Sequence, residues 1–106
     1  MPTAKTPFIV LYRWRLHPGR EAGFIAAWSR LTERLKERGS LGSRLHRGPD
    51  GLLYGYAQWP SDETRLAAFA ENLDPNAFEQ MSAAIAERFP EIQLEPVADY
   101  LEPLDR

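Results

Sequence analysis

The segment from Phe8 to Leu16 reads as one β-strand whose two faces differ in chemistry. Successive strand residues point to opposite sides of a sheet. One face is wholly apolar and aromatic, and it carries Phe8, Val10, Tyr12, Trp14 and Leu16. The other face is apolar at its start and basic at its end, and it carries Ile9, Leu11, Arg13, Arg15 and His17. Since neither face suits water along its whole length, the strand predicts a sheet that is covered by helices on one side and by another subunit on the other.

A helix is expected directly after this strand, over residues 18–38. Pro18 suits the first helical position and Glu21 suits the first turn. Apolar residues then recur at helical spacing, namely Phe24, Ala27, Trp28, Leu31 and Leu35. Gly39 is a typical C-terminal stop.

A β-hairpin and a broken helical region follow. Strands are expected over residues 42–47 and 52–59, because the Gly-Pro-Asp-Gly turn at 48–51 separates them. Ser61 is placed to cap a helix, and Leu66, Phe69 and Leu73 mark its expected buried side. A further helix is expected to begin with Asp74 as its cap and Pro75 at the first helical position. It is expected to continue to Phe89 and to end at Pro90.

The last strand is expected from Ile92 to Leu101, with a bulge at Pro96, because proline cannot donate to a strand ladder. The resulting order of strands and helices is βαββαβ, which is typical of ferredoxin-like domains. The sequence thus predicts an α+β fold with an antiparallel sheet and helices on one face. We expect a single domain over residues 1–106, with its core at about residues 8–101.

Composition excludes several classes of function. The chain has no cysteine and only two histidines, so no metal site is predicted. The formal net charge is −2 and the charges are interspersed, which gives nucleic-acid binding no support. The longest apolar run is far shorter than the ~20 residues that cross a membrane, and the N-terminus lacks the apolar core of a signal peptide. The sequence therefore predicts a cytoplasmic protein with no membrane association.

Aromatic side chains form the first candidate site. The residues proposed to line a pocket for a flat apolar ligand are Tyr12, Trp14, Trp28, Trp59, Phe78 and Met81. Gly55 and Ala57 share a strand face with Trp59, and such small residues leave room in front of a sheet. The alternative is a core that is simply built from large side chains.

Polar side chains on the opposite sheet face form a second candidate site. Its residues are Arg44, His46, Tyr54 and Tyr56. Tyrosine and arginine are enriched at subunit interfaces, which favours an interface here. The alternative is an anion or phenolate site in which His46 acts as a base.

Four segments together resemble the antibiotic biosynthesis monooxygenase superfamily of dimeric α/β barrels. The resemblance covers most of residues 8–101 and rests on the order of Leu16–Glu21 with Phe24, Leu41–Leu45, Trp59–Glu63 and Asp74–Phe78. It implies a ferredoxin-like subunit that forms a homodimer through the sheet face. It also implies a cofactor-independent monooxygenase that acts on an aromatic or quinol-like small molecule. The alternative is a non-catalytic dimeric module of the same fold that binds small molecules or is associated with stress.

The resemblance also bears on cofactors. In the haem-degrading members an Asn, a Trp and a His are expected at the positions that hold Tyr12, Trp59 and Ser82 here. Only the tryptophan matches, so haem is not expected, and neither is any other cofactor. In the cofactor-free members the ring would lie against Tyr12, Trp14 and Trp59. No general base is visible on that strand face, and whether the chain is an enzyme stays open.

Overall fold

Five antiparallel strands build one sheet in the structure, a computed structural model that describes residues 6–102. The strands are β1 (Phe8–Leu16), β2 (Gly42–Arg47), β3 (Leu53–Trp59), β4 (Ile85–Arg88) and β5 (Ile92–Leu94). The sheet order is β2-β3-β1-β4, and β5 pairs with β1 on the same side as β4. β4 pairs with the C-terminal end of β1 and β5 with its N-terminal half, so β1 is the central strand.

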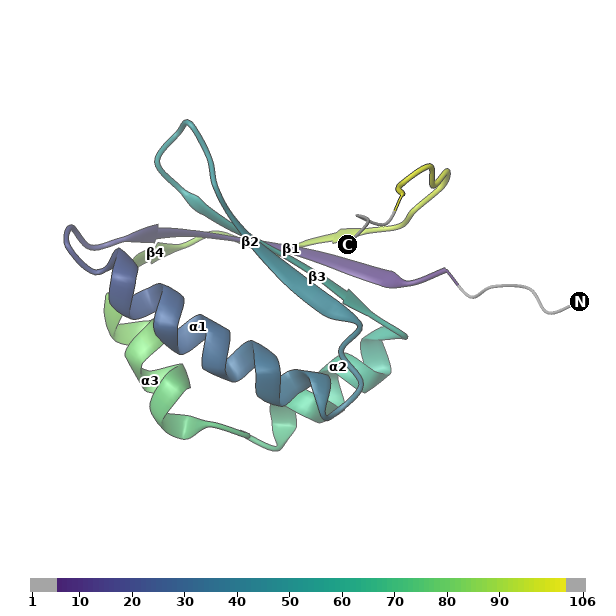
Figure 1. The fold of residues 1–106 in the computed structure, drawn as a ribbon, viewed down its shortest axis with the longest axis horizontal. Coiled ribbons are helices and arrows are strands. Elements are labelled where there is room, and N and C mark those ends of the chain that lie inside the picture. Colours follow the sequence, from purple (N-terminus) through teal and green to yellow (C-terminus); the bar gives the residue numbers. More distant parts are fainter. Residues whose placement is uncertain (1–5, 103–106) are drawn as a thin grey trace, which may run out of the picture.

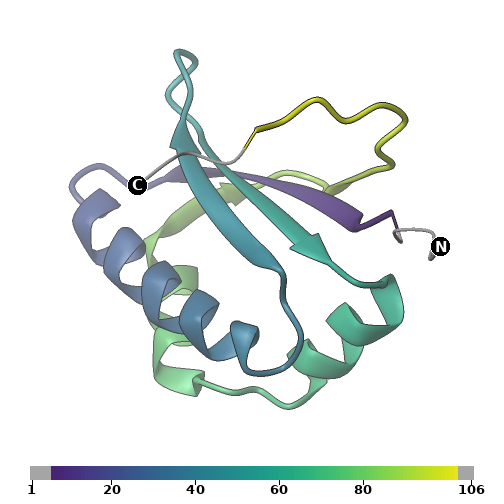
Figure 2. The same ribbon diagram turned by 45° about the vertical axis from the view of Figure 1, so that its right-hand side comes forward.

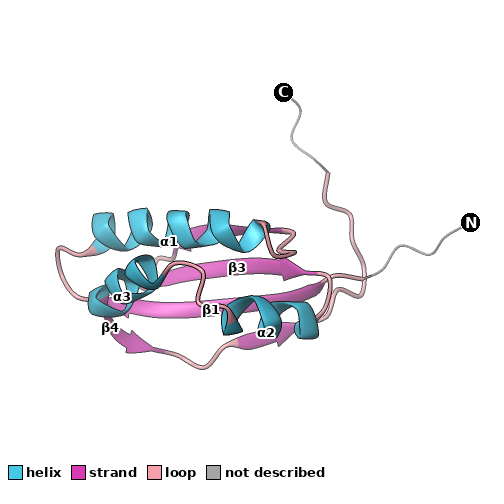
Figure 3. Ribbon diagram, turned by 90° about the horizontal axis from the view of Figure 1, so that it is seen from below, coloured by secondary structure: helices cyan, strands magenta, loops and turns pink. Residues whose placement is uncertain are grey.

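Three helices cover one face of this sheet (Figures 1 and 3). They are α1 (Glu21–Lys36), α2 (Asp62–Ala70) and α3 (Pro75–Ala84). α1 and α3 pack side by side, and the Arg30 guanidinium of α1 donates to Asp74 and Gln80 at distances of 3.3 Å. The fold class is confirmed: an α+β, ferredoxin-like arrangement with an antiparallel sheet and helices on one face.

The core lies between the sheet and the helices. Alternate residues of β3 are buried, as expected for a strand with one covered face. The helices contribute both small and large apolar residues to the core, among them Phe24, Ala27, Ala68 and Ala77. Trp59 is 1% exposed and packs against Phe69 of α2, with ring centroids 6.1 Å apart.

The first helix begins three residues later than predicted. Pro18 and Gly19 form a turn in which the Arg20 N–H donates to the His17 carbonyl at 3.2 Å. Gly19 has φ +80°, which a right-handed helix cannot contain. The predicted Pro18 start is therefore wrong, and Arg20 occupies the N-cap position without a side-chain hydrogen bond. The predicted caps Ser61 and Asp74 are confirmed, since each side chain accepts a backbone N–H three residues on.

The third helix ends five residues earlier than predicted, because strand pairing replaces the helix. Ile85 has an extended backbone (φ −88°, ψ 121°), and β4 pairs with β1 from that residue. Phe89, Pro90 and Glu91 then separate β4 from β5. The predicted strand Ile92–Leu101 with a bulge at Pro96 is also wrong, since β5 stops at Leu94 and the break in pairing lies at residues 89–91.

Residues 95–102 form a C-terminal arm on the side of the sheet that faces away from the helices (Figures 1 and 2). Ile9 lies on that face and yet is only 3% exposed, in a hollow that arm residues line. Val97 and Tyr100 of the arm are 93% and 91% exposed. The chain thus covers part of its own far sheet face and presents apolar groups beside the rest.

The buried side of α2 differs from the prediction. Leu66 is 56% exposed and Phe69 is 40% exposed, whereas Arg65 and Ala68 are buried. Leu73, just after α2, is half-buried. The helix is therefore turned so that an arginine, rather than a leucine, meets the sheet. Among the helices of residues 6–102, none combines the length and the apolar character that a membrane crossing requires.

We expect Trp59→Ala to lower the free energy of unfolding by about 3–5 kcal/mol, because it empties a fully buried site. Urea denaturation followed by circular dichroism measures this. Leu66→Ala is the matched control on the exposed side of α2 and should change stability by no more than about 0.5 kcal/mol. Equal stability of the Trp59→Ala variant and the unmodified chain would contradict the assigned packing.

Candidate functional site

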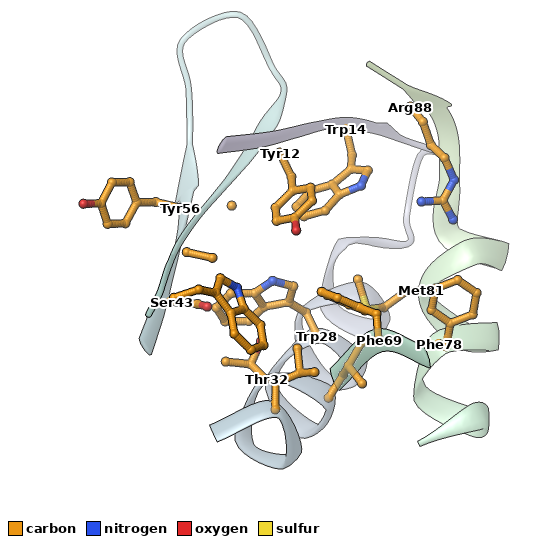
Figure 4. A pocket seen from close by; sticks show the side chains of 15 residues that line it. Tyr12, Trp14, Trp28, Thr32, Ser43, Tyr56, Phe69, Phe78, Met81 and Arg88 are labelled. Carbon is orange, nitrogen blue, oxygen red and sulfur yellow. The ribbon is translucent and has the colours of Figure 1, made fainter. Parts of the chain in front are cut away.

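A cavity of about 160 Å³ lies between the sheet and the three helices, and we call it the aromatic cavity (Figure 4). All six side chains that the sequence proposed for a pocket line it, namely Tyr12, Trp14, Trp28, Trp59, Phe78 and Met81. They come from β1, α1, β3 and α3, and Phe69 of α2 and Arg88 of β4 complete the wall. Aromatic residues that are far apart in the sequence thus surround one apolar space.

The shape of the aromatic cavity depends on the contact between Trp14 and Gly55. A Cβ atom at Gly55 would lie 2.8 Å from Cη2 of Trp14, so only glycine admits the indole at this distance. The Trp14 ring stacks on Tyr12 (centroids 5.8 Å apart, 7° between planes) and meets Phe24 edge-on at 5.1 Å. Trp14 is therefore held from three directions.

Two phenylalanines stand where the aromatic cavity meets solvent. Phe69 is 40% exposed and Phe78 is 49% exposed, although both line the cavity. Figure 4 shows them on neighbouring helices, beside Met81. The exposed residues of the described lining are thus these two phenylalanines and Arg88.

A buried arginine supports one wall of the aromatic cavity. The Arg65 side chain is 7% exposed and lies over the Phe8 ring, with the guanidinium carbon 5.6 Å from the centroid. Its Nη1 donates to the Tyr12 hydroxyl at 3.0 Å. Its other partners are the carboxylates of Asp62, in the same helix, and Glu91, in the break between β4 and β5.

This cluster fixes the protonation of Tyr12. Burial raises the pKa of the Tyr12 hydroxyl, and the Arg65 guanidinium opposes that rise only in part. Tyr12 therefore keeps its proton at neutral pH. Burial tends to lower the pKa of Arg65, but hydrogen bonds to Glu91 and Tyr12 outweigh it, so the pKa is raised and the guanidinium stays charged.

The second candidate site lies on the opposite sheet face. Arg44 is paired with Tyr56, and His46 with Tyr54, in the ladder between β2 and β3. The Tyr54 hydroxyl donates to Asp50, and the Tyr56 hydroxyl donates to Gln58 at 3.0 Å. Figure 4 shows the Tyr56 ring pointing away from the aromatic cavity. His46 is exposed and reaches no part of that cavity.

The basic end of the far face is occupied within the chain. The guanidinium carbons of Arg13 and Arg15 lie 5.4 Å and 5.8 Å from the ring centroid of Phe89. Arg15 also pairs with Glu87 at 3.2 Å. From the sequence, this face is expected to contact another subunit. In the structure, β4 and the residue after it contact these two arginines.

No carboxylate or imidazole lines the aromatic cavity among the described residues, and the ionisable groups there are Tyr12 and Arg88, since the Tyr56 ring points away. Within residues 6–102 no group of three or more candidate ligands is placed to hold a metal ion. The described wall can therefore bind and orient an apolar ring, and it offers hydroxyl and guanidinium groups as hydrogen-bond donors.

Sequence reasoning missed Arg65 and Glu91. The spacing of Asp62 and Arg65 is that of an ion pair on one helix face, and it was the only available signal. Such a pair normally lies in solvent, so its spacing in the sequence does not indicate that the arginine is buried. Glu91 follows a proline in an irregular segment, where no periodic pattern exists.

Comparison with known proteins finds likeness in structure only. No model of a protein family matches the sequence, and no curated protein matches it. A protein of Chloroflexus aurantiacus J-10-fl that is provisionally described as an antibiotic biosynthesis monooxygenase superimposes with a TM-score of 0.75 and 18% identity, covering 89% of this chain and 96% of that one. PA3566 of Pseudomonas aeruginosa gives a TM-score of 0.73 at 18% identity, covering 92% and 100%. A dimeric ferredoxin-like protein from an uncultured marine organism gives 0.69 at 10%, covering 92% and 94%.

These likenesses place the chain in a structural class. It has the ferredoxin-like fold found in structures described as antibiotic biosynthesis monooxygenases, as the sequence resemblance predicted. At identities of 10–18% the likeness establishes the fold alone.

We expect Gly55→Ala to destabilise the protein by about 1–3 kcal/mol, since the new methyl group must displace the held Trp14 ring. Gly23→Ala, in the exposed part of α1 with open space around it, should instead stabilise by about 0.5–1 kcal/mol. Thermal denaturation of both variants distinguishes the two effects. The same sign of change in both would contradict the close fit at Gly55.

Proposed function

We propose that the aromatic cavity binds a flat, electron-rich phenol or quinol and that the chain is a cofactor-independent monooxygenase. The observation that carries this proposal is the enclosure of one apolar space by Tyr12, Trp14, Trp28 and Trp59, which come from three elements. Aromatic walls with few polar groups suit a planar ring. The monooxygenase descriptions of structural neighbours support the reaction class.

The reaction uses dioxygen as its second substrate. An ionised phenol is rich enough in electrons to reduce dioxygen directly once its ring is held in place. The ring loses one C–H hydrogen and the phenol proton, and the two carbons concerned become the carbonyl groups of a quinone. One oxygen atom enters the product, and the other leaves as water with the two hydrogens. The protein contributes by orienting the ring and by excluding water from it.

The volume of the cavity sets the size of the ligand. A cavity of about 150 Å³ in an engineered protein holds benzene, and the present one is about 160 Å³. A single ring therefore fits as the structure stands. A larger polycyclic phenol would have to extend past Phe69 and Phe78, which stand at the opening.

A non-catalytic binding module is the second candidate. The observation that favours it is the lack of a carboxylate or imidazole on the described cavity wall. Without such a base the protein can hold a ring but cannot itself remove a proton. A phenol that is already ionised when it binds needs no base from the protein.

Oxygen uptake with a panel of phenols and quinols, and with no added cofactor, distinguishes the two candidates. We expect uptake with single-ring quinols and saturable quenching of tryptophan fluorescence. Trp14→Ala should weaken both by at least tenfold, since it removes a cavity wall, and His46→Ala should leave both unchanged. Folding of both variants is checked by circular dichroism. Binding without uptake would support the binding module, and a larger effect of His46→Ala would move the site to the far sheet face.

We also propose a homodimer formed through the far sheet face. Leu11, Tyr54 and Tyr56 lie on this face and are only half-buried, and no described helix covers them. The exposed apolar residues of the C-terminal arm lie beside them. A dimeric ferredoxin-like neighbour supports a second copy as the occupant.

Light scattering at micromolar concentration should give about twice the chain mass of 12.1 kDa. Tyr56→Glu should shift the protein toward a monomer, because it puts a charge into an apolar contact. Glu63→Lys, on the exposed side of α2, is the control and should leave the mass unchanged. A monomeric unmodified chain would contradict the proposal.

A further inference from the structure

Arg65 donates four hydrogen bonds within the protein, and its Nη2 also lies at ion-pair distance from Asp62. The Nε–H and one Nη2–H approach Asp62 Oδ1 at 2.9 Å and 2.8 Å. Nη1 and Nη2 donate to the two oxygens of Glu91 at 3.3 Å and 3.0 Å, and the remaining Nη1–H donates to Tyr12. Each of the three side-chain nitrogens of Arg65 therefore already has a partner within the protein.

The Tyr12 hydroxyl is left with a proton to donate. Its oxygen accepts from Arg65, and within the described part of the chain we find no hydrogen bond that this hydroxyl donates. Figure 4 shows the Tyr12 hydroxyl oxygen on the side of the ring that faces the aromatic cavity, which Tyr12 lines. A polar hydrogen that faces an apolar space has much to gain from an acceptor on a ligand.

We propose that the Tyr12 hydroxyl donates a hydrogen bond to the phenolate or carbonyl oxygen of the bound ring, and that Arg65 is the positioning residue that aims this hydroxyl. The proposal rests on the proposed function of the aromatic cavity and names the polar group that the ligand must carry. The N–H donated by Arg65 withdraws charge from the Tyr12 oxygen and strengthens its O–H as a donor. A donor directed at a developing oxyanion stabilises it strongly where water is excluded.

The charges of the side chains around Tyr12 nearly cancel. The direction in which the Tyr12 hydroxyl changes the pKa of a bound phenol can therefore be stated. Arg65 and Arg88 supply two positive charges, and Asp62 and Glu91 supply two negative ones. The decisive contact is then the neutral Tyr12 hydroxyl. Burial in the cavity raises the pKa of a bound phenol, as it does for Tyr12, and a hydrogen bond from Tyr12 to the charged form opposes that rise.

The experiment uses two fluorinated single rings that differ by one hydroxyl, 2,6-difluorophenol and 1,3-difluorobenzene. Titration followed by ¹⁹F NMR gives the affinity of each ring and the pH at which the bound phenol ionises. For the unmodified protein we expect the phenol to bind more tightly than the hydrocarbon and to ionise at a lower pH than it does when bound to the Tyr12→Phe variant.

Tyr12→Phe removes only the hydroxyl. We expect it to weaken phenol binding on the order of tenfold, to raise the pH at which the bound phenol ionises and to leave hydrocarbon binding unchanged. The variant leaves one Arg65 N–H without its partner, so its binding is measured well below its melting temperature. Tyr100→Phe makes the same chemical change in the exposed C-terminal arm and is the matched control with no expected effect.

Variants around Arg65 test the positioning role through the ionisation of the bound phenol. Arg65→Lys keeps the charge but loses the planar fork, so the bound phenol should ionise at a higher pH than in the unmodified protein while hydrocarbon binding holds. Asp62→Asn removes a nearby negative charge at a half-exposed position, so the bound phenol should ionise at a lower pH than in the unmodified protein. If Arg65 and Asp62 only supported the fold, their two variants would not shift the pH of ionisation of the bound phenol in opposite directions.

The outcomes separate this inference from the proposed function. If neither ring binds the unmodified protein, the proposed function of the cavity fails. If both rings bind equally well, or if Tyr12→Phe weakens both equally, the cavity binds rings but the hydrogen bond from Tyr12 is disproved. If Arg65→Lys and Asp62→Asn both leave the ionisation of the bound phenol unchanged, Arg65 has no positioning role.

Discussion

The close approach of the Trp14 indole to the backbone at Gly55 sets the depth of the layer between sheet and helices. Gly55 pairs with Tyr12 in the ladder and lies diagonally across from Trp14, and the indole can approach the strand this closely because Gly55 has no Cβ. Tyr12 stacks on that indole and Phe24 meets its edge, so the position of both follows from the same contact. The remaining space is the aromatic cavity, whose volume is what these fixed rings leave unfilled.

The interruption of the last strand links this layer to its polar group. β4 and β5 both pair with β1, but Pro90 lies between them and cannot donate to the ladder. Glu91 leaves the ladder at this point and reaches the buried Arg65, which in turn holds Tyr12. An irregularity at the sheet edge thereby stabilises a charge in the interior, where an unpaired guanidinium would be strongly unfavourable.

The sequence was informative where a feature repeats or has a local cause. The alternation of β1 and the capping residue Ser61 have local physical signatures, and the structure has both. The end of α3 could not be predicted, because Ile85 and Phe89 continue a helical spacing while the pairing with β1 requires an extended chain. The meeting of six distant aromatic and apolar residues followed from strand faces and helix stripes. The arginine cluster did not, because it depends on three-dimensional neighbours that no periodicity encodes.

The two half-exposed phenylalanines bear on how quickly the cavity can exchange its contents. Phe69 and Phe78 belong to different helices, and the opening between them is bounded by side chains. Exposed rings of this kind change rotamer in picoseconds to nanoseconds, whereas moving a packed helix takes microseconds or longer. Under the proposed function, a small ring would enter and leave through side-chain rotation. Residence time is then governed by the contacts inside the cavity and not by a conformational barrier of the backbone.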